Sequence, residues 1–276
     1  MSGFWEPFQF AFFRNGLAVA TLAGALCGLI GVYVVLRNMS YIGHGLSHAI
    51  FGGAAASALV GFNFFVGAGI WGLAAGLAIG RVARRRGIAA DAAIGIVTTA
   101  SFAFGIALLG LFGQVRRALD TTLFGSILGV TTADVVFVAI VTLLAAGLVF
   151  FGYRRLLFTT FDPEVAQASG IRTGWVDAVL MAVLSLCVLV SMKVLGVVLV
   201  AATLVTPAVT ARLLTASFAR LLWLSVTIGA LSGAVGMIAS YHVDISSGAT
   251  IVLVSTAVFI VVYALTARSR RSLHLP

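Results

Sequence analysis

Long apolar runs alternate with short polar clusters along almost the whole chain. A membrane-spanning helix needs about 20 consecutive apolar residues, and nine runs approach or reach this length. Some runs are short or separated by only one or two residues, so we expect eight or nine membrane spans. The pattern predicts an all-α, polytopic integral membrane protein with one transmembrane domain over residues 1–276. The nine runs are Gly16–Leu36, Ile42–Val60, Phe62–Gly80, Ala92–Phe112, Val135–Gly152, Trp175–Met192, Val194–Leu214, Leu221–Tyr241 and Ala249–Ala267.

Glycines recur inside these runs with a spacing of four. Small residues at this spacing let two helix backbones approach closely, either within one subunit or between subunits. The motifs are Gly24-x3-Gly28, Gly72-x3-Gly76-x3-Gly80 and Gly229-x3-Gly233. The glycines around 43–53 and Pro207 are read differently, as breaks in membrane helices. In transporters, broken helices mark substrate paths, because the freed backbone must line a cavity or be buried in protein.

The composition supports a membrane protein. Of the 276 residues, 61% are hydrophobic and only 9% are charged, whereas soluble domains carry roughly 25% charged residues. The formal net charge is +9, which alone could suggest a nucleic-acid partner. The basic residues, however, sit in short clusters between apolar runs, and this placement favours control of membrane topology.

The basic clusters also assign the sides of the membrane. Nine spans with the N-terminus outside place 13 of the 17 basic residues in the cytoplasm, in agreement with the positive-inside rule. The inside residues are Arg37 and the basic residues of the ranges Arg81–Arg86, Arg154–Arg172, Arg212–Arg220 and Arg268–Arg271. The outside residues are Arg14, Arg116, Arg117 and Lys193. Residues 1–14 are expected to lie along the interface, and residues 268–276 form a cytoplasmic tail.

Several kinds of chemistry are missing from the sequence. There is no G-x-x-x-x-G-K-[S/T] motif, and the single lysine, Lys193, follows no glycine-rich loop, so ATP would have to be hydrolysed by another polypeptide. Cys27 and Cys187 both lie in apolar runs and are interpreted as small buried hydrophobic residues. No nucleophile and base constellation is evident, which argues against a membrane enzyme.

Two of the four histidines form the segment "GHGLSH", in which His44 and His48 are four residues apart. On a helix they share one face, which is the geometry of a metal-binding pair. No glutamate stands between them as in H-E-x-x-H metalloproteases. Spacing alone leaves two readings about even, a metal path and two hydrogen-bonded polar residues between helices. Ionisable residues inside a membrane are functional candidates, which favours the metal path.

Two imidazoles do not complete a metal site, since a tight zinc site usually has four ligands. Two copies of the chain around a two-fold axis would supply four. Alternatively, the pair is an incomplete waypoint, because conduction requires a site weak enough for the ion to leave.

Two polar segments outside the spans are further candidates. In the cytoplasmic segment 153–174, Asp162 can cap a short helix with Pro163 at its first position, Glu164 in its first turn and Gly170 at its end. This segment could dock a cytoplasmic partner or be a plain solvated loop. On the outer side, His242 and Asp244 could contact a metal or a partner protein.

An ordered set of segments resembles the permease subunits of bacterial ABC importers for manganese, zinc and iron. The resemblance covers residues from about 15 to 265. The segments are "VVLRNMSYIGHGLSHAIFGGAAAS", "DAAIGIVTTASFAFGIAL", "LFGSILGV", "FDPEVAQASGI", "LGVVLVAATLVTPAVTARLL" and "SGATIVLVSTAVF". The resemblance implies a fold like that of type II ABC importers, in the bacterial plasma membrane.

The resemblance also implies partners and residue roles. The partners would be an identical or paired permease, two cytoplasmic ATP-binding subunits and an extracytoplasmic metal-binding protein. Asp162 to Gly170, including Ala166, would form the coupling helix that seats in the ATPase. The family commonly reads G-D-x-L-S-H, so His48 matches the family histidine and His44 replaces the usual aspartate. A neutral imidazole softens the site and makes binding more sensitive to pH.

These observations predict a non-enzymatic permease that imports a divalent transition metal by alternating access, with no permanently bound cofactor. Manganese or zinc is preferred over iron. One alternative is an importer of a metal chelate, against which the histidine pair argues. Another is a secondary transporter driven by ion gradients, which would need membrane acids for coupling. The acids instead cluster at the edges of the spans.

Overall fold

The computed structural model describes residues 6–85, 87–112, 129–196 and 199–272. These ranges form one short 3-10 helix and ten α-helices, without any β-strand. In chain order the elements are η1 (Glu6–Gln9), α1 (Ala11–Leu36), α2 (Ile42–Leu59), α3 (Phe64–Ala83), α4 (Ala90–Phe112), α6 (Thr132–Phe161), α7 (Pro163–Ala168), α8 (Thr173–Leu195), α9 (Val200–Leu214), α10 (Phe218–Val243) and α11 (Ser247–Ser272).

Each of the nine predicted runs coincides with one helix, which confirms the all-α membrane fold. Seven of these helices are long and apolar enough to cross a membrane, and the other two are α2 and α9. The 15 residues of α9 span only about 22 Å, less than the hydrocarbon core of about 30 Å. Of the segment 1–14, which we expected along the membrane interface, residues 1–5 lie outside the described ranges. Residues 6–9 form η1, and α1 already begins at Ala11.

The prediction that glycines and Pro207 interrupt helices is wrong. Helix α2 runs unbroken through its glycines, and Pro207 lies inside α9. The glycines of α2 instead allow close contacts with neighbouring helices, as described below, and membrane helices tolerate a proline when neighbours satisfy the freed backbone. The interruption between α8 and α9 begins instead at Gly196, which ends α8. Its φ of 79° is a conformation that favours glycine.

The glycine motifs pack helices within this one subunit. At Gly24 a Cβ would collide with the carbonyl oxygen of Gly229, and at Gly229 it would collide with that of Gly24. The next turns repeat the contact, since Gly28 meets the backbone of Ser225, whose Oγ donates to the Gly28 carbonyl at 2.6 Å. Helices α1 and α10 therefore lie backbone against backbone, as the four-residue spacing predicts.

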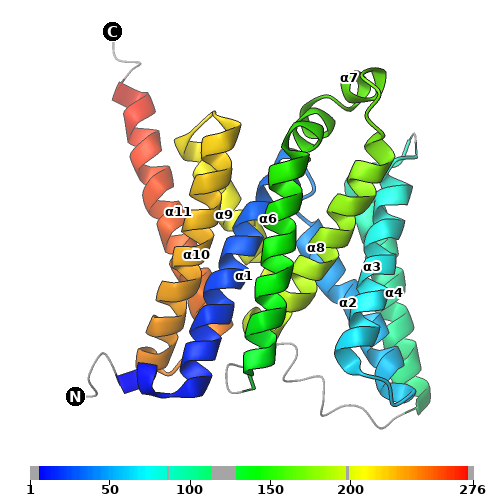
Figure 1. The fold of residues 1–276 in the computed structure, drawn as a ribbon, viewed down its shortest axis with the longest axis vertical. Helices are drawn as coiled ribbons and strands as arrows, with labels where there is room; N and C mark the ends of the chain where they lie inside the picture. Colours follow the sequence, from blue (N-terminus) through cyan, green and yellow to red (C-terminus); the bar gives the residue numbers. More distant parts are fainter. Residues whose placement is uncertain (1–5, 86, 113–128, 197–198, 273–276) are drawn as a thin grey trace.

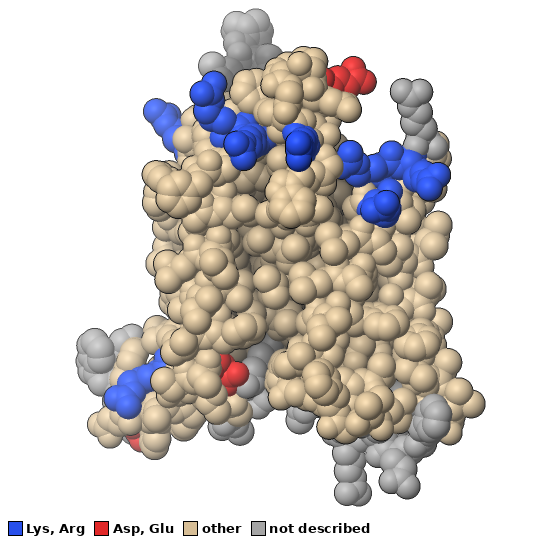
Figure 2. Space-filling model, turned by 45° about the vertical axis from the view of Figure 1, so that its right-hand side comes forward, with Lys and Arg blue, Asp and Glu red and all other residues tan. Residues whose placement is uncertain are grey.

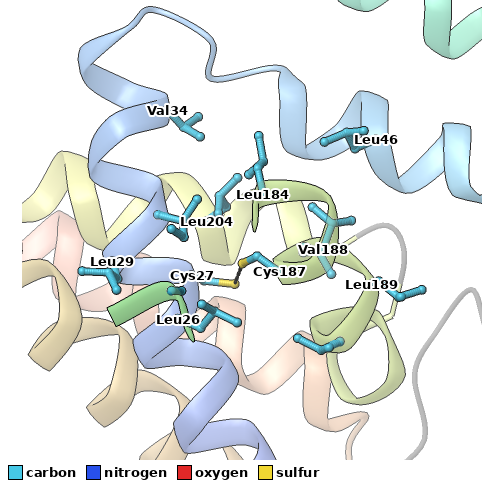
Figure 3. Close-up of a cluster of buried hydrophobic side chains, with 14 of the residues drawn as sticks. Leu26, Cys27, Leu29, Val34, Leu46, Leu184, Cys187, Val188, Leu189 and Leu204 are labelled. Carbon is cyan, nitrogen blue, oxygen red and sulfur yellow. Dashed lines mark hydrogen bonds between the residues drawn. The ribbon is translucent and has the colours of Figure 1, made fainter. Parts of the chain in front are cut away.

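The core lies where α1, α2, α8 and α9 meet (Figure 3). Cys27 of α1 and Cys187 of α8 are fully buried there, with their Sγ atoms 3.9 Å apart and no disulfide. Both point toward each other among leucine and valine side chains (Figure 3). The prediction that both cysteines are buried hydrophobic residues is confirmed.

The helices form two groups joined by α8 (Figure 1). One group contains α1, α6, α9, α10 and α11, and the other contains α2, α3 and α4. Helix α8 runs obliquely between them and contacts α1 and α6 in the first group and α3 in the second. Movement of α8 would therefore change contacts with both groups of helices.

The two ends of the bundle differ in charge. Arginines form a belt at the end that carries α7 and the C-terminus, as Figures 1 and 2 show together. This is the end predicted to be cytoplasmic, and it fits the positive-inside rule. Arg14 belongs to the first turns of α1, at the opposite end. Arg116 and Arg117, which fit the rule poorly, lie outside the described residues.

Candidate functional site

The "GHGLSH" segment forms the first turns of α2, and its two glycines explain how His44 is oriented. A Cβ on Gly43 would come within 3.3 Å of the Ala201 Cα in α9. A Cβ on Gly45 would come within 2.7 Å of the Ile94 and Thr98 side chains in α4. Because successive residues are about 100° apart on a helix, close packing on these two sides leaves His44 on a third, less covered side.

The structure brings the two imidazoles together. The ring centroids of His44 and His48 are 4.5 Å apart, with an angle of 76° between the ring planes. Both residues are half-buried, whereas Leu46 on the opposite face and Ser47 beside the pair are fully buried. The Ser47 hydroxyl donates to the backbone carbonyl of His44 at 2.8 Å and not to a ring nitrogen of either histidine. The pair thus forms a partly accessible strip on α2.

Neither imidazole forms a hydrogen bond with a described residue. Their ring contacts are aromatic instead: Tyr41 lies 5.3 Å from His44, and Phe102 of α4 lies 5.1 Å from His48. Imidazole nitrogens that are not engaged by neighbouring side chains remain able to bind a cation. This geometry favours the metal path over the alternative of two hydrogen-bonded residues between helices.

The described part of one subunit offers a metal ion no more than this pair of ligands. Among the described residues, no group of three or more His, Cys, Asp or Glu side chains could hold a metal ion. With two imidazole ligands, the remaining coordination positions of a divalent ion must be filled by water or by a second protein chain. The arrangement suits either a site completed by a second copy or a weak site from which an ion can leave.

Sequence reasoning missed the aromatic surroundings of the pair. Phe51 lies one further turn along α2, and its ring is 5.3 Å from that of Phe102. The signal was present in the spacing, because Tyr41, His44, His48 and Phe51 follow the three- and four-residue steps of one helix face. That Phe102 would join this strip from α4 could not be read from the sequence.

The polar segment after α6 folds as predicted. The Asp162 carboxylate accepts from the Val165 N–H at 3.0 Å and caps α7, and Pro163 is the first residue of that helix. Gly170 has a φ of 81° and ends the segment, and the Ile171 N–H donates to the Ala166 carbonyl at 3.0 Å. These capping predictions are confirmed.

Helix α7 lies at one end of the molecule (Figure 1). Helix α6, which directly precedes α7, has 30 residues and is about 45 Å long, more than the thickness of a membrane core. The last turns of α6 therefore place α7 at the far end of the bundle (Figure 1). Ala166 is fully buried and anchors the short helix, whereas Val165 is 48% exposed and Glu164 is exposed. An apolar and an acidic side chain therefore project from this end of the molecule.

The outer candidates lie at the opposite end of the bundle. His242 is in the last turn of α10, and its Nδ1 is 2.9 Å from the Ile238 carbonyl of the same helix. Asp244 follows as the C-cap with a φ of 56°. Both side chains are exposed, but the structure gives no contact between them and the pair on α2.

Comparison with known proteins confirms the resemblance over most of the chain. The model of the ABC 3 transport family matches residues 9–266. The manganese transport system membrane protein MntC of Listeria innocua is 38% identical over 255 residues, which cover 92% of this chain and 91% of that protein. A protein of Haemophilus influenzae named "Probable iron transport system membrane protein" is 34% identical and covers 94% of this chain and 95% of its own length.

A solved structure shares the fold. The structure described as PsaBC from Streptococcus pneumoniae in complex with Fab superimposes with a TM-score of 0.83. The sequences are 33% identical, and the alignment covers 94% of both chains.

Proposed function

Because the chain belongs to the ABC 3 transport family, we propose that it is the permease subunit of an ATP-driven importer that carries manganese into the cell. It is a multi-pass protein of the bacterial plasma membrane and a transport component rather than an enzyme. The observation that carries the proposal is the family match over almost the whole chain, together with a half-exposed histidine pair inside the helical bundle.

In this proposal His44 and His48 line the path of the ion. Their imidazoles are free of hydrogen bonds to described residues and stand 4.5 Å apart on one face of α2. A second permease subunit completes the path and doubles the number of ligands. The ion is held by few protein ligands, so it can exchange them for water and move on.

Energy enters from other polypeptides. Two cytoplasmic ATP-binding subunits hydrolyse ATP, and α7, with Asp162, Pro163, Glu164, Ala166 and Gly170, docks on them. An extracytoplasmic metal-binding protein delivers the ion to the outer end, where the side chains of His242 and Asp244 are exposed. Closure of the ATP-binding subunits moves α7 and, through it, α8, which contacts both groups of helices.

Transport then follows alternating access. A ligand shifts a conformational equilibrium only by the difference in its affinity for the two states. The ion must therefore be bound more tightly in the outward-facing state than in the inward-facing state. The pair on α2 can provide this difference if its distance from the second subunit's pair changes.

Manganese is proposed first because relatives similar over the whole length, such as the Listeria protein, carry manganese in their names. Iron is a competing cargo, since the Haemophilus relative is named for iron. Zinc is a further possible cargo, because neutral imidazole is a good zinc ligand. An importer of a metal chelate is less favoured, because a chelated ion offers few open positions to a histidine pair.

Transport by the reconstituted complex tests the function. The permease, co-expressed with its ATPase and supplied with the metal-binding protein, should accumulate manganese in proteoliposomes only when ATP is present. Uptake of radioactive or fluorescently detected Mn²⁺, Zn²⁺ and Fe²⁺ should rank manganese first. Uptake driven by a proton or sodium gradient without ATP would contradict the proposal and support a secondary transporter.

Charge reversal in α7 tests the docking role. Glu164→Arg should reduce the amount of ATPase that copurifies with the permease severalfold, because it replaces an exposed acid on the docking surface with a cation. The matched control is Glu6→Arg, the same reversal at the opposite end of the molecule, which should leave copurification unchanged. Full recovery of the ATPase with Glu164→Arg would argue against docking through α7.

A further inference from the structure

A cavity of about 710 Å³ lies between the cytoplasmic ends of α3 and α8. It is separate from the histidine pair, and the transport proposal above assigns it no role. Arg81 of the last turn of α3 lines it together with Arg84 and Arg85, which follow the end of that helix, and Asp177 lines it from the first turns of α8. The cavity is therefore strongly charged at its polar end.

The single acid lining the cavity is already paired. Asp177 accepts a hydrogen bond at 2.6 Å from Arg37, the C-cap residue of α1, and its other oxygen lies 3.5 Å from Arg84. Arg37 also donates to the Thr160 hydroxyl at 3.2 Å. Three lining arginines against one carboxylate leave an excess of two positive charges, and Arg37 behind Asp177 adds another.

Arg84 lies close to a glycine of α8. At Gly174 in α8 a Cβ would lie 3.0 Å from the Arg84 guanidinium carbon, so the absence of a side chain there leaves room for Arg84 against the start of α8. Arg81 and Arg85 are exposed, and neither makes an ion pair with a described residue. These two guanidinium groups supply the cavity with donors that an anion can use.

The rest of the cavity wall is apolar. Leu77 and Ala78 of α3 face Ala178 and Met181 of α8, and Leu77 is 43% exposed. Trp175, next to Gly174, is 70% exposed, and tryptophan favours the interface between lipid headgroups and acyl chains. The cavity thus has a cationic end at headgroup depth and an apolar wall one to two helical turns deeper.

We propose that this cavity binds an anionic phospholipid of the cytoplasmic leaflet. Arg81 and Arg85 bind the headgroup phosphate through charge-assisted hydrogen bonds, which arginine forms with two donors at once. An acyl chain lies along Leu77 and Met181. Basic pockets between membrane helices at the cytoplasmic side suit this ligand class. A free phosphate ion would leave the apolar wall uncovered, and an acidic protein segment would have to enter the headgroup layer.

The bound lipid would connect two parts of the transporter. Its phosphate contacts the end of α3, and its chain lies against α8, which begins directly after the α7 segment. Lipid occupancy would therefore brace α3 against α8 at the end where α7 projects.

Lipid retention by the purified transporter complex tests the site. The complex is extracted from membranes containing phosphatidylglycerol and phosphatidylcholine, and tightly bound lipid is measured by native mass spectrometry. We expect phosphatidylglycerol to be retained preferentially, and the double variant Arg81→Gln/Arg85→Gln to reduce its occupancy by about fivefold or more. The matched control is Arg154→Gln/Arg155→Gln, which removes two exposed cytoplasmic arginines of α6 that do not line the cavity.

The competing occupants give different results. Equal loss of lipid in both double variants, or equal retention of the two lipids, would overturn the proposal. Thermal stabilisation by glycerol phosphate that matches stabilisation by the lipid would assign the cavity to a soluble anion and also overturn it. Loss of the copurifying ATPase from Arg81→Gln/Arg85→Gln with unchanged lipid occupancy would make the arginines a docking contact instead.

Discussion

Replacing both His44 and His48 with alanine should lower ATP-driven manganese uptake by roughly tenfold or more. Loss of an outer-shell partner alone costs about 10- to 100-fold in metal affinity, and this variant removes both imidazoles that one subunit presents at the strip on α2. The substitutions should not disturb folding, since both side chains are half-exposed and form no hydrogen bond with a described residue. Uptake into proteoliposomes at matched ATPase content is the measurement.

The control for this variant keeps both imidazoles and removes a neighbouring aromatic ring. Phe51→Leu changes the same face of α2 and its contact with Phe102 but leaves both imidazoles. It should retain most of the uptake. If Phe51→Leu loses as much uptake as the double histidine variant, or if the histidine variant transports normally, the imidazoles do not act as ligands.

A second substitution separates the two positions. His44→Asp places a hard carboxylate oxygen where this chain has a softer nitrogen, and manganese prefers oxygen more than zinc does. The ratio of manganese to zinc uptake should therefore rise. An unchanged ratio would indicate that His44 points away from the ion and that His48 alone lines the path.

Replacing Gly24 with leucine should prevent stable folding of the permease. The Cβ alone would collide with the Gly229 carbonyl, and the opposing carbonyl belongs to backbone that cannot turn away as a side chain can. Helices α1 and α10 would have to separate along the contact that also includes Gly28 and Gly233. Overpacking of a well-packed core costs about 1–3 kcal/mol, and separation of two helices exceeds that range.

Protein yield and thermal unfolding measure this effect. The Gly24→Leu protein should give little monodisperse material in detergent or unfold at a clearly lower temperature than the wild type. The matched control is Gly147→Leu in α6, where a Cβ meets no atom within 4 Å, and it should behave as the wild type. Normal stability of Gly24→Leu would mean that α1 and α10 are not in backbone contact in the membrane.

The sequence predicted local features well because their causes are local. The nine apolar runs correspond to nine helices, since a helix in lipid satisfies its own backbone hydrogen bonds and needs only length and hydrophobicity. The cap at Asp162 and the left-handed Gly170 were also predictable, because they depend on neighbours within a few residues. The belt of arginines followed from charges that cannot enter the bilayer core.

The sequence failed where a residue's role depends on a partner helix. The glycines of α2 looked like helix breakers, but their neighbours are Ala201 in α9 and Thr98 in α4. The same holds for Asp177, which looked like a residue at the edge of a span. In the structure it pairs with Arg37 and Arg84, which cap the C-terminal ends of two other helices. No periodicity within one helix contains this information.

The sequence by itself thus determined that the chain crosses the membrane repeatedly and that His44 and His48 share a helix face, and it predicted which end faces the cytoplasm. Only the tertiary structure decided that this face is half-exposed and that the glycines beside it bring α4 and α9 close. The physical reason is that hydrophobicity and helix geometry act along the chain, whereas exposure is set by helices packed from distant parts of it. The cavity beside Arg81 and Arg85 likewise exists only because α3 and α8 end side by side.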